Sequence, residues 1–369
     1  ALFLCVSALS GVQNEVSRAA HEAGDATTSH TFVRYASIVI GVTTVVATIA
    51  GTFVTLSVFP DMPIVVLGSF VLGVVAVAGI TLMTGALYGT RRWGGVAVAI
   101  VADPTIRALA FATMLGCVLL ASMWPVPAAA SLFAVSAPFV VAALIIWFTA
   151  GRRAVSTISF DVGVAGLLKN TAHTLIASTA LGFMAAGMPI IVTMLGRDAP
   201  SGLLAGTVLL VVLVRAPLVS PMIALQSYLT VSFRDAPGTA WRRAGVVSGA
   251  LLSVTAVLAA TAAIWATPLV TAVVPHYVLP SPGVISAIVV GAGLVGVQTV
   301  TGALVLSRSL HRAYAAGWVA TALLTVALSF VPLDFGAAVA LCLTAPGVIG
   351  CAIHMLAGRT GRAGKAQHL

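Results

Sequence analysis

The sequence predicts an all-α polytopic membrane protein, and three observations lead to this fold class. Hydrophobic residues make up 60% of the 369 residues and charged residues only 7%, whereas about a quarter of the residues in an ordinary soluble domain are charged. The apolar residues gather into runs of about 20 or more, the length at which a helix crosses a bilayer. The basic residues lie almost entirely in the short segments between these runs.

Ten apolar runs are long enough to be complete membrane-spanning helices. They are expected near residues 35–58, 64–88, 96–122, 128–149, 171–195, 203–231, 245–273, 284–306, 313–331 and 335–356. Residues 1–11 are apolar but too short to span, and they lack the basic n-region of a signal peptide. We interpret them as the cytoplasmic end of a helix whose start precedes this sequence, which makes about 11 spans.

The basic residues predict the orientation of the chain. If the segment after residue 11 is cytoplasmic and the sides then alternate, all but three of the 18 Lys and Arg residues lie on the cytoplasmic side. Of the exceptions, Arg197 lies outside, and Arg107 and Arg215 fall within spans. This distribution follows the positive-inside rule. We therefore expect a multi-pass protein of the cytoplasmic membrane with a cytoplasmic C-terminus.

Short matches at a nearly constant spacing indicate two related halves. The matches keep their order and their predicted side of the membrane, although hydrophobic bundles also resemble one another by chance. They pair Gln13 with Gln226, Pro60 with Pro275, Thr84–Leu87 with Thr301–Leu304, Ala137-Pro138 with Ala345-Pro346, and Gly151-Arg152 with Gly358-Arg359. An even number of helices returns the chain to the same side, so the halves are expected to be parallel six-helix lobes. The first lobe then lacks its first helix.

This repeat predicts the domain organisation. An N-terminal lobe is expected at 1–150, a cytoplasmic linker at 151–170, a C-terminal lobe at 171–357 and a basic cytoplasmic tail at 358–369. The middle of the linker is mildly amphipathic, which favours a segment that lies along the membrane interface.

Arg215 is the first candidate binding residue, because it stands near the middle of a predicted span with Pro217 and Pro221 after it. A guanidinium in lipid costs about 2.5 kcal/mol or more, so an intramembrane Arg indicates a functional site. Its planar guanidinium can make bidentate, charge-assisted bonds to phosphate oxygens. The alternative is a structural Arg that bonds backbone carbonyls loosened by Pro217 or pairs with an acid elsewhere.

Two further pairs of polar residues are candidates. Asp103 and Arg107 stand one helical turn apart and can pair with each other. Pro104 between them frees backbone groups, which suits a kinked helix beside a wet cavity. Either the pair neutralises itself, or Arg107 faces a cavity and Asp103 tunes it. Gln13 and Gln226, at the cytoplasmic ends of corresponding helices, either contact the substrate or bond helix to helix.

Four segments carry a resemblance to a known family. They are GVQNEVSRAA at 11–20, MTGALYGTRRWGG at 83–95, VRAPLVSPMIALQ at 214–226 and AAGWVATALL at 315–324. In their order they resemble the O-antigen-type lipid-linked oligosaccharide flippases of the multidrug/oligosaccharidyl-lipid/polysaccharide exporter superfamily. The resemblance implies two six-helix lobes around a central cavity that opens alternately to the two sides. It also implies a sugar chain on a polyprenyl pyrophosphate as substrate, and a polysaccharide polymerase or glycosyltransferases as candidate partners.

Absent motifs narrow the function classes further. No GxxxxGK[ST] loop, HExxH motif or GxSxG elbow occurs in the sequence, so we expect neither an ATP-driven pump nor an enzyme, and no metal or other cofactor. The net charge of +9 is not arranged as a basic stripe with aromatics, so no nucleic-acid partner is expected. Three classes remain: the flippase, an ion-coupled small-molecule or drug exporter of the same fold, and a non-transporting scaffold. Asp103 is the only acid deep in a span, and this scarcity favours the flippase.

Overall fold

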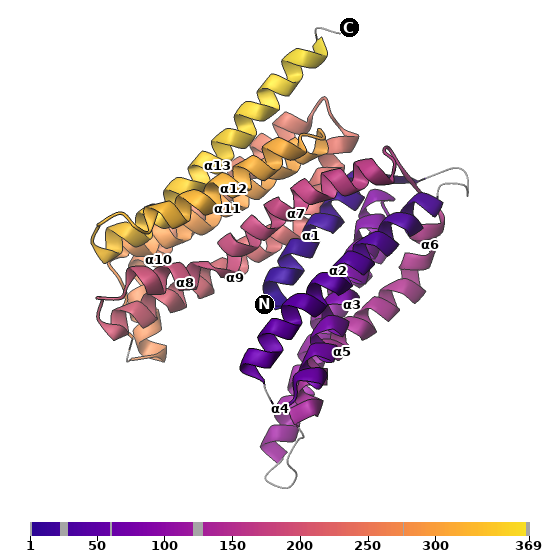
Figure 1. The fold of residues 1–369 in the computed structure, drawn as a ribbon. Coiled ribbons are helices and arrows are strands. Elements are labelled where there is room, and N and C mark those ends of the chain that lie inside the picture. The colour runs from indigo at the N-terminus through magenta and orange to yellow at the C-terminus, as the bar shows by residue number, and fades with distance from the viewer. Residues whose placement is uncertain (1, 23–28, 60, 121–127, 276, 367–369) are drawn as a thin grey trace. The chain divides into compact units, whose positions relative to one another are not determined.

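The computed structural model describes residues 2–22, 29–59, 61–120, 128–275 and 277–366, and most of them are helical (Figure 1). The helices are α1 (Leu2–Ala19), α2 (Ser29–Val58), α3 (Pro63–Gly89), α4 (Trp93–Leu120), α5 (Ala128–Ile146), α6 (Arg152–Ser156), α7 (Val164–Ala186), α8 (Met188–Leu195), α9 (Ser201–Asp235), α10 (Ala240–Val273), α11 (Pro282–Ser307), α12 (His311–Leu328) and α13 (Phe335–Ala366). A π-helical segment, η2 (Trp147–Gly151), follows α5, and two short strands are present, β1 (Ala20–Glu22) and β2 (Ile158–Phe160).

Each of the ten predicted spans coincides with a helix or with two successive helical segments. Eight helices of the described chain are long and apolar enough to cross a membrane. The pair α7 and α8 makes a ninth if it counts as one span, although it is bent by 53°. The break falls at Gly187, and Pro189 behind it has no N–H to continue the hydrogen-bond ladder. The helical, polytopic membrane fold is confirmed, whereas the total of about 11 spans stays a prediction.

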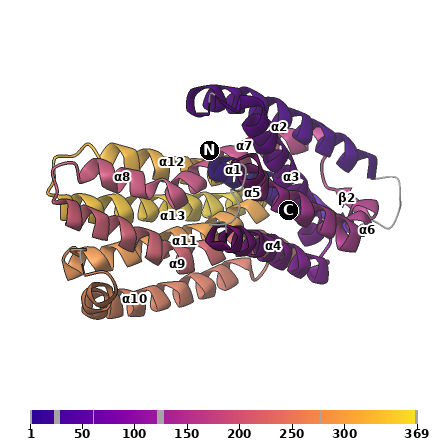
Figure 2. The same cartoon turned by 90° about the horizontal axis from the view of Figure 1, so that it is seen from below.

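The chain divides into two compact units, residues 1–175 and 176–369. In the first unit, α3 packs against α1, α2 and α5, and α4 packs against α5. In the second, α11 packs against α9, α10 and α13, and α12 packs against α13. Figure 2 shows α9, α10, α11 and α13 of the second unit running side by side. The packing of α1 to α5 thus recurs in α9 to α13, which supports the internal repeat; the lobe boundaries at 150 and 171 stay predictions.

The turn after α3 recurs in detail after α11. Among the described residues, Arg91 and Ser309 are the non-glycine residues with positive φ, at 56° and 61°. In both turns, the N–H of the following residue bonds to a helix carbonyl five positions earlier, which is the Schellman arrangement. A non-glycine residue in this region costs about 1–2 kcal/mol. The same strained turn at matching places in both units is a second sign of the repeat.

The segment between the two halves differs from the amphipathic linker that the sequence predicts. Its middle forms β2, which pairs antiparallel with β1, and α7 already begins at Val164. Ile158 is buried and Phe160 stacks on Phe32, with ring centroids 6.2 Å apart. Apolar residues at alternate positions suit a strand with one buried face, and a helix would have separated them. The linker therefore folds onto the first unit.

Candidate functional site

Arg215 lies near the middle of α9 and is only 5% exposed. Within the described part of the chain, neither Nη1 nor Nη2 has a hydrogen-bond partner. Bonds from these nitrogens to carbonyls loosened by Pro217, the structural role that the sequence left open, are therefore not seen among those residues. Helix α9 runs on through both Pro217 and Pro221. A buried cation with open donors requires an acceptor, because a charged group left unsatisfied is costly.

Gln226 lies 11 residues further along α9, about 16 Å of helix rise from Arg215. It is buried, and its Nε2 donates to the hydroxyl of Tyr314 in α12. This is the helix-to-helix bond that the sequence offered as the alternative to a sugar contact. Arg215 and Gln226 therefore do not contact each other, and a substrate contact by Gln226 stays a prediction.

Tyr314 belongs to a buried cluster of polar side chains, with Gln226, Thr301 and His354, that the sequence analysis did not predict. Its ring stacks on the imidazole of His354 in α13, with centroids 6.1 Å apart. The Nδ1 of His354 is 3.2 Å from the hydroxyl of Thr301, and its Nε2 donates to the carbonyl of Tyr314 at 3.2 Å. A Cβ at Gly317 would collide with the imidazole, so this glycine leaves the space that His354 fills. Because these polar groups are buried and bonded across α11, α12 and α13, they fix how the three helices pack.

Arg107 in α4 belongs to the first unit. Its Cζ lies 5.1 Å from the centroid of the Phe139 ring in α5, a cation–π contact. The side chain of Asp103 lies outside the described residues, so its pairing with Arg107 stays a prediction. Gln13 of α1 is half-buried and also belongs to the first unit. The five candidates therefore divide between the units, with Arg215 and Gln226 in the second.

A buried charged cluster at the end of α1 escaped the sequence analysis. Glu15 is fully buried and Arg18 is 3% exposed. The Nε and Nη2 atoms of Arg18 donate to the two carboxylate oxygens of Glu15 at 2.9 and 2.8 Å, a bidentate pair. The Nη1 of Arg18 donates to Asp161, just after β2, at 2.9 Å, and the side-chain amide of Asn170 donates to Glu15 at 3.0 Å.

This cluster ties the linker and the start of α7 to α1. Burial by itself lowers the pKa of Arg18, but its bonds with Glu15 and Asp161 and their charges outweigh burial and raise that pKa above its usual range. The guanidinium of Arg18 therefore stays protonated at every physiological pH. The spacing of Glu15 and Arg18, three residues apart, was a usable signal, but residues 12–34 were interpreted as a cytoplasmic segment. The contacts that this cluster makes with Asp161 and Asn170 have no signature in the sequence.

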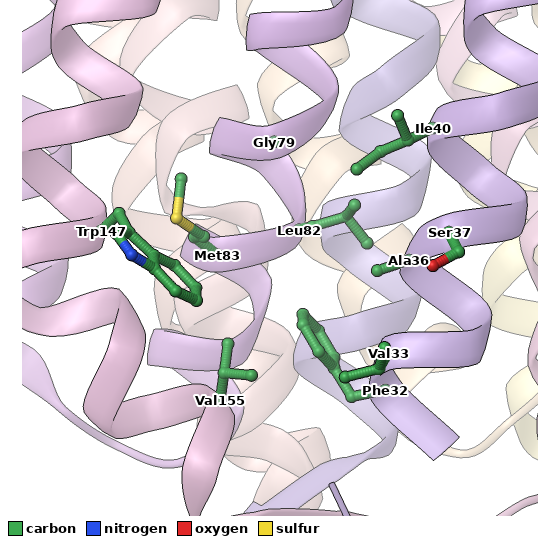
Figure 3. Close-up of a pocket in the computed structure, with 10 residues that line it drawn as sticks. All are labelled: Phe32, Val33, Ala36, Ser37, Ile40, Gly79, Leu82, Met83, Trp147 and Val155. Atoms are coloured by element: carbon green, nitrogen blue, oxygen red, sulfur yellow. The ribbon is translucent and has the colours of Figure 1, made fainter. Parts of the chain in front are cut away.

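An apolar pocket of about 280 Å³ lies within the first unit, between α2, α3, η2 and α6. Figure 3 shows Phe32, Ile40 and Leu82 on one side and Met83 and Trp147 on the other. Trp147 opens the π-helical segment η2, a type of distortion that is frequent at functional sites. The lining carries no charged side chain, so this pocket suits a hydrocarbon group and not an anion.

Among the described residues, no group of three or more His, Cys, Asp and Glu side chains is placed to hold a metal ion. Cys5, Cys342 and Cys351 are free thiols. The side chain of the fourth cysteine, Cys117, lies outside the described residues. Cys342 is fully buried, as is usual for a cysteine that packs as a small apolar residue.

No family model matches the chain. Uncharacterized proteins of Mycobacterium tuberculosis and Mycobacterium bovis are 28% identical to it over 280 residues, which are 74% of this chain and 62% of theirs. A second uncharacterized protein of Mycobacterium tuberculosis is 27% identical over 297 residues, 79% of this chain and 65% of its own length. The chain thus spans a little under two thirds of the length of the curated relatives that it matches.

Two solved structures share the fold. One is an outward-facing multidrug resistance MATE family transporter of the MOP superfamily, with a TM-score of 0.60 and 13% identity over 97% of this chain and 84% of that one. The other is a mutant of the Vibrio cholerae MATE transporter VcmN, with a TM-score of 0.60 and 12% identity over 97% of this chain and 86% of that one. The chain therefore has the same fold as these two MATE transporters.

Proposed function

We propose that this chain belongs to a membrane transporter that flips a polyprenyl-pyrophosphate-linked oligosaccharide across the cytoplasmic membrane. Transport proceeds by alternating access and serves the synthesis of a cell-surface polysaccharide. The fold of MATE transporters supports a transporter. The four sequence segments that resemble O-antigen-type flippases support the substrate class.

The observation that carries the proposal is the guanidinium of Arg215. It stands in an apolar span, it is 5% exposed, and its two terminal nitrogens have no partner among the described residues. A ligand with several anionic oxygens, such as a pyrophosphate, accepts from both nitrogens at once. The cost of burying the charge in the empty protein is then recovered when the substrate binds. Arg107 of the first unit is the second cation proposed to meet the substrate.

The alternative is an ion-coupled exporter of small molecules or drugs, and one structural neighbour is described as a multidrug resistance transporter. Such an exporter is expected to couple ions through a buried carboxylate. Glu15 is a buried acid, but Arg18 and Asn170 already bond both of its oxygens. Asp103 is thus the acid left for that role in the predicted spans. The predicted spans thus offer one candidate carboxylate for ion coupling, whereas Arg215 is buried and its two terminal nitrogens have no partner among the described residues. This difference favours the flippase.

The test is Arg215→Ala in the native host, with surface polymer and lipid-linked oligosaccharide measured together. We expect polymer export to be lost and the lipid-linked oligosaccharide to accumulate, while the amount of folded protein in the membrane is unchanged. Arg197→Ala is the matched control, because Arg197 is an exposed arginine on a loop, and it is expected to export normally. Normal export from a folded Arg215→Ala protein would rule out the anion-binding role. Loss of drug efflux with normal polymer after gene deletion would favour the exporter.

A further inference from the structure

Two arginines without an ion pair among the described residues, Arg242 and Arg243, line a groove between the ends of α9 and α10. This groove belongs to the second unit. The groove has a volume of about 520 Å³. Tyr228 and Ser232 line it from α9, and Arg242 and Arg243 line it from the first turn of α10. We propose that this groove binds the phosphate headgroup of an anionic phospholipid of the surrounding membrane.

The charge of the groove is not balanced by the protein. Asp235 is the only acid in the sequence between Asp198 and Asp334, and it pairs with Arg234 at 3.1 Å. Among the described residues, neither Arg242 nor Arg243 forms an ion pair. The Nη1 of Arg243 only reaches the hydroxyl of Ser232, at 3.5 Å. Because both guanidinium groups line the same groove, a bound anion lowers the repulsion between their charges.

The first unit provides a contrast at the corresponding place. In the repeat, Glu15 of α1 matches Tyr228 of α9, because both stand two residues after the matched glutamines. In the first unit, Glu15 and Asp161 supply the anions that Arg18 binds. The second unit has a neutral side chain at the position of Glu15. At the same spacing Val231 stands at the position of Arg18, so this end of the second unit has no counterpart of the Glu15–Arg18 pair, and Arg242 and Arg243 have no matched acid to bind.

The walls of the groove select a lipid over a soluble anion. Leu229 and Phe233 line it from α9, and Val246, which is 67% exposed, lines it from α10. Beyond Val246, toward the C-terminal end of α10, the exposed face of the helix includes the apolar residues Val254 and Val257. A headgroup phosphate would meet the arginines while the acyl chains cover this face. The basic residues place this end of the helices at the cytoplasmic leaflet, where basic pockets between helices recognise anionic headgroups.

The test is lipid binding to the purified protein by native mass spectrometry, with short-chain phosphatidylglycerol and phosphatidylcholine as probes. We expect a clear preference for phosphatidylglycerol in the wild type. Each arginine near a headgroup contributes about fivefold in affinity, so the double variant Arg242→Gln/Arg243→Gln is expected to bind phosphatidylglycerol about thirtyfold more weakly. Its binding of phosphatidylcholine is expected to stay the same.

The matched control is Arg312→Gln, an exposed arginine in the first turn of α12 that does not line the groove. It should bind phosphatidylglycerol as the wild type does. Equal binding of the two lipids by the wild type, or unchanged phosphatidylglycerol binding by the double variant, would overturn the proposal. Displacement of the lipid by equimolar inorganic phosphate would reassign the groove to a soluble anion. A preference for farnesyl pyrophosphate over phosphatidylglycerol would reassign it to a prenyl-pyrophosphate ligand.

Discussion

Replacing Arg18 by Gln is expected to destabilise the first unit by about 3–5 kcal/mol, the cost of breaking a buried ion pair from one side. Glu15 is fully buried, and the substitution removes both short bonds from Arg18 to its carboxylate. Asn170 still donates to Glu15, but a neutral donor does not balance a buried negative charge. The uncompensated carboxylate therefore dominates the loss.

Two comparison variants separate the buried charge from the simple loss of a contact. Asp161→Asn removes the other partner of Arg18, but the side chain of Asp161 is 39% exposed, so we expect a loss of about 1 kcal/mol or less. The double variant Glu15→Gln/Arg18→Gln leaves neither Glu15 nor Arg18 as a buried charge and is expected to regain most of the stability lost by Arg18→Gln.

The assay is unfolding of the purified protein in mixed micelles by added denaturing detergent, followed by circular dichroism. The free energies of the three variants are compared with that of the wild type in one double-mutant cycle. The reasoning fails if Arg18→Gln costs no more than Asp161→Asn. It also fails if the double variant is as unstable as Arg18→Gln, because the loss would then not come from the stranded carboxylate.

Two further predictions use the same unfolding assay. Gly317→Ala is expected to cost about 1–3 kcal/mol through overpacking, because its Cβ would collide with the imidazole of His354. The control is Gly245→Ala, whose added carbon would meet no other part of the protein within 4 Å outside its own stretch of helix, and it is expected to gain roughly 0.5–1 kcal/mol. A Gly317→Ala protein as stable as the wild type would contradict the close packing of His354 against Gly317. Ser309→Gly is expected to stabilise the protein by up to about 1 kcal/mol, since it relieves a non-glycine residue at a φ of 61°. A less stable Ser309→Gly protein would mean that its side chain contributes more than the strain costs.

Local patterns predicted most of the helices. Apolar length decided where the chain spans, so the predicted spans fell on the observed helices. The repeated Thr-Gly-Ala-Leu segment led to the same helix end and the same strained turn in both units. The break at Gly187 was missed, because an apolar run shows where a helix is buried and not whether it is straight. The β1–β2 pair was also missed, since two strands of three residues each form only by meeting.

The candidate site was predicted less completely than the fold. Arg215 stood out because a charge in an apolar run is visible locally, and its burial agrees with that position. Gln226 was also singled out, but its bond to Tyr314 connects residues 88 positions apart. The cluster of Glu15 and Arg18 depends on Asp161, 143 positions from Arg18. No spacing rule reaches across such separations.

The sequence by itself determined that this is a helical membrane protein, where most of its spans lie and which arginines fall within them, because these follow from apolar length and charge along the chain. Only the tertiary structure decided which polar groups are satisfied. Glu15 and Arg18 neutralise each other against the linker, whereas Arg215 in α9 and the arginines of the α9–α10 groove have no anion among the described residues. The physical reason is that an ionic partner is chosen by proximity in space, and folding alone brings distant residues together.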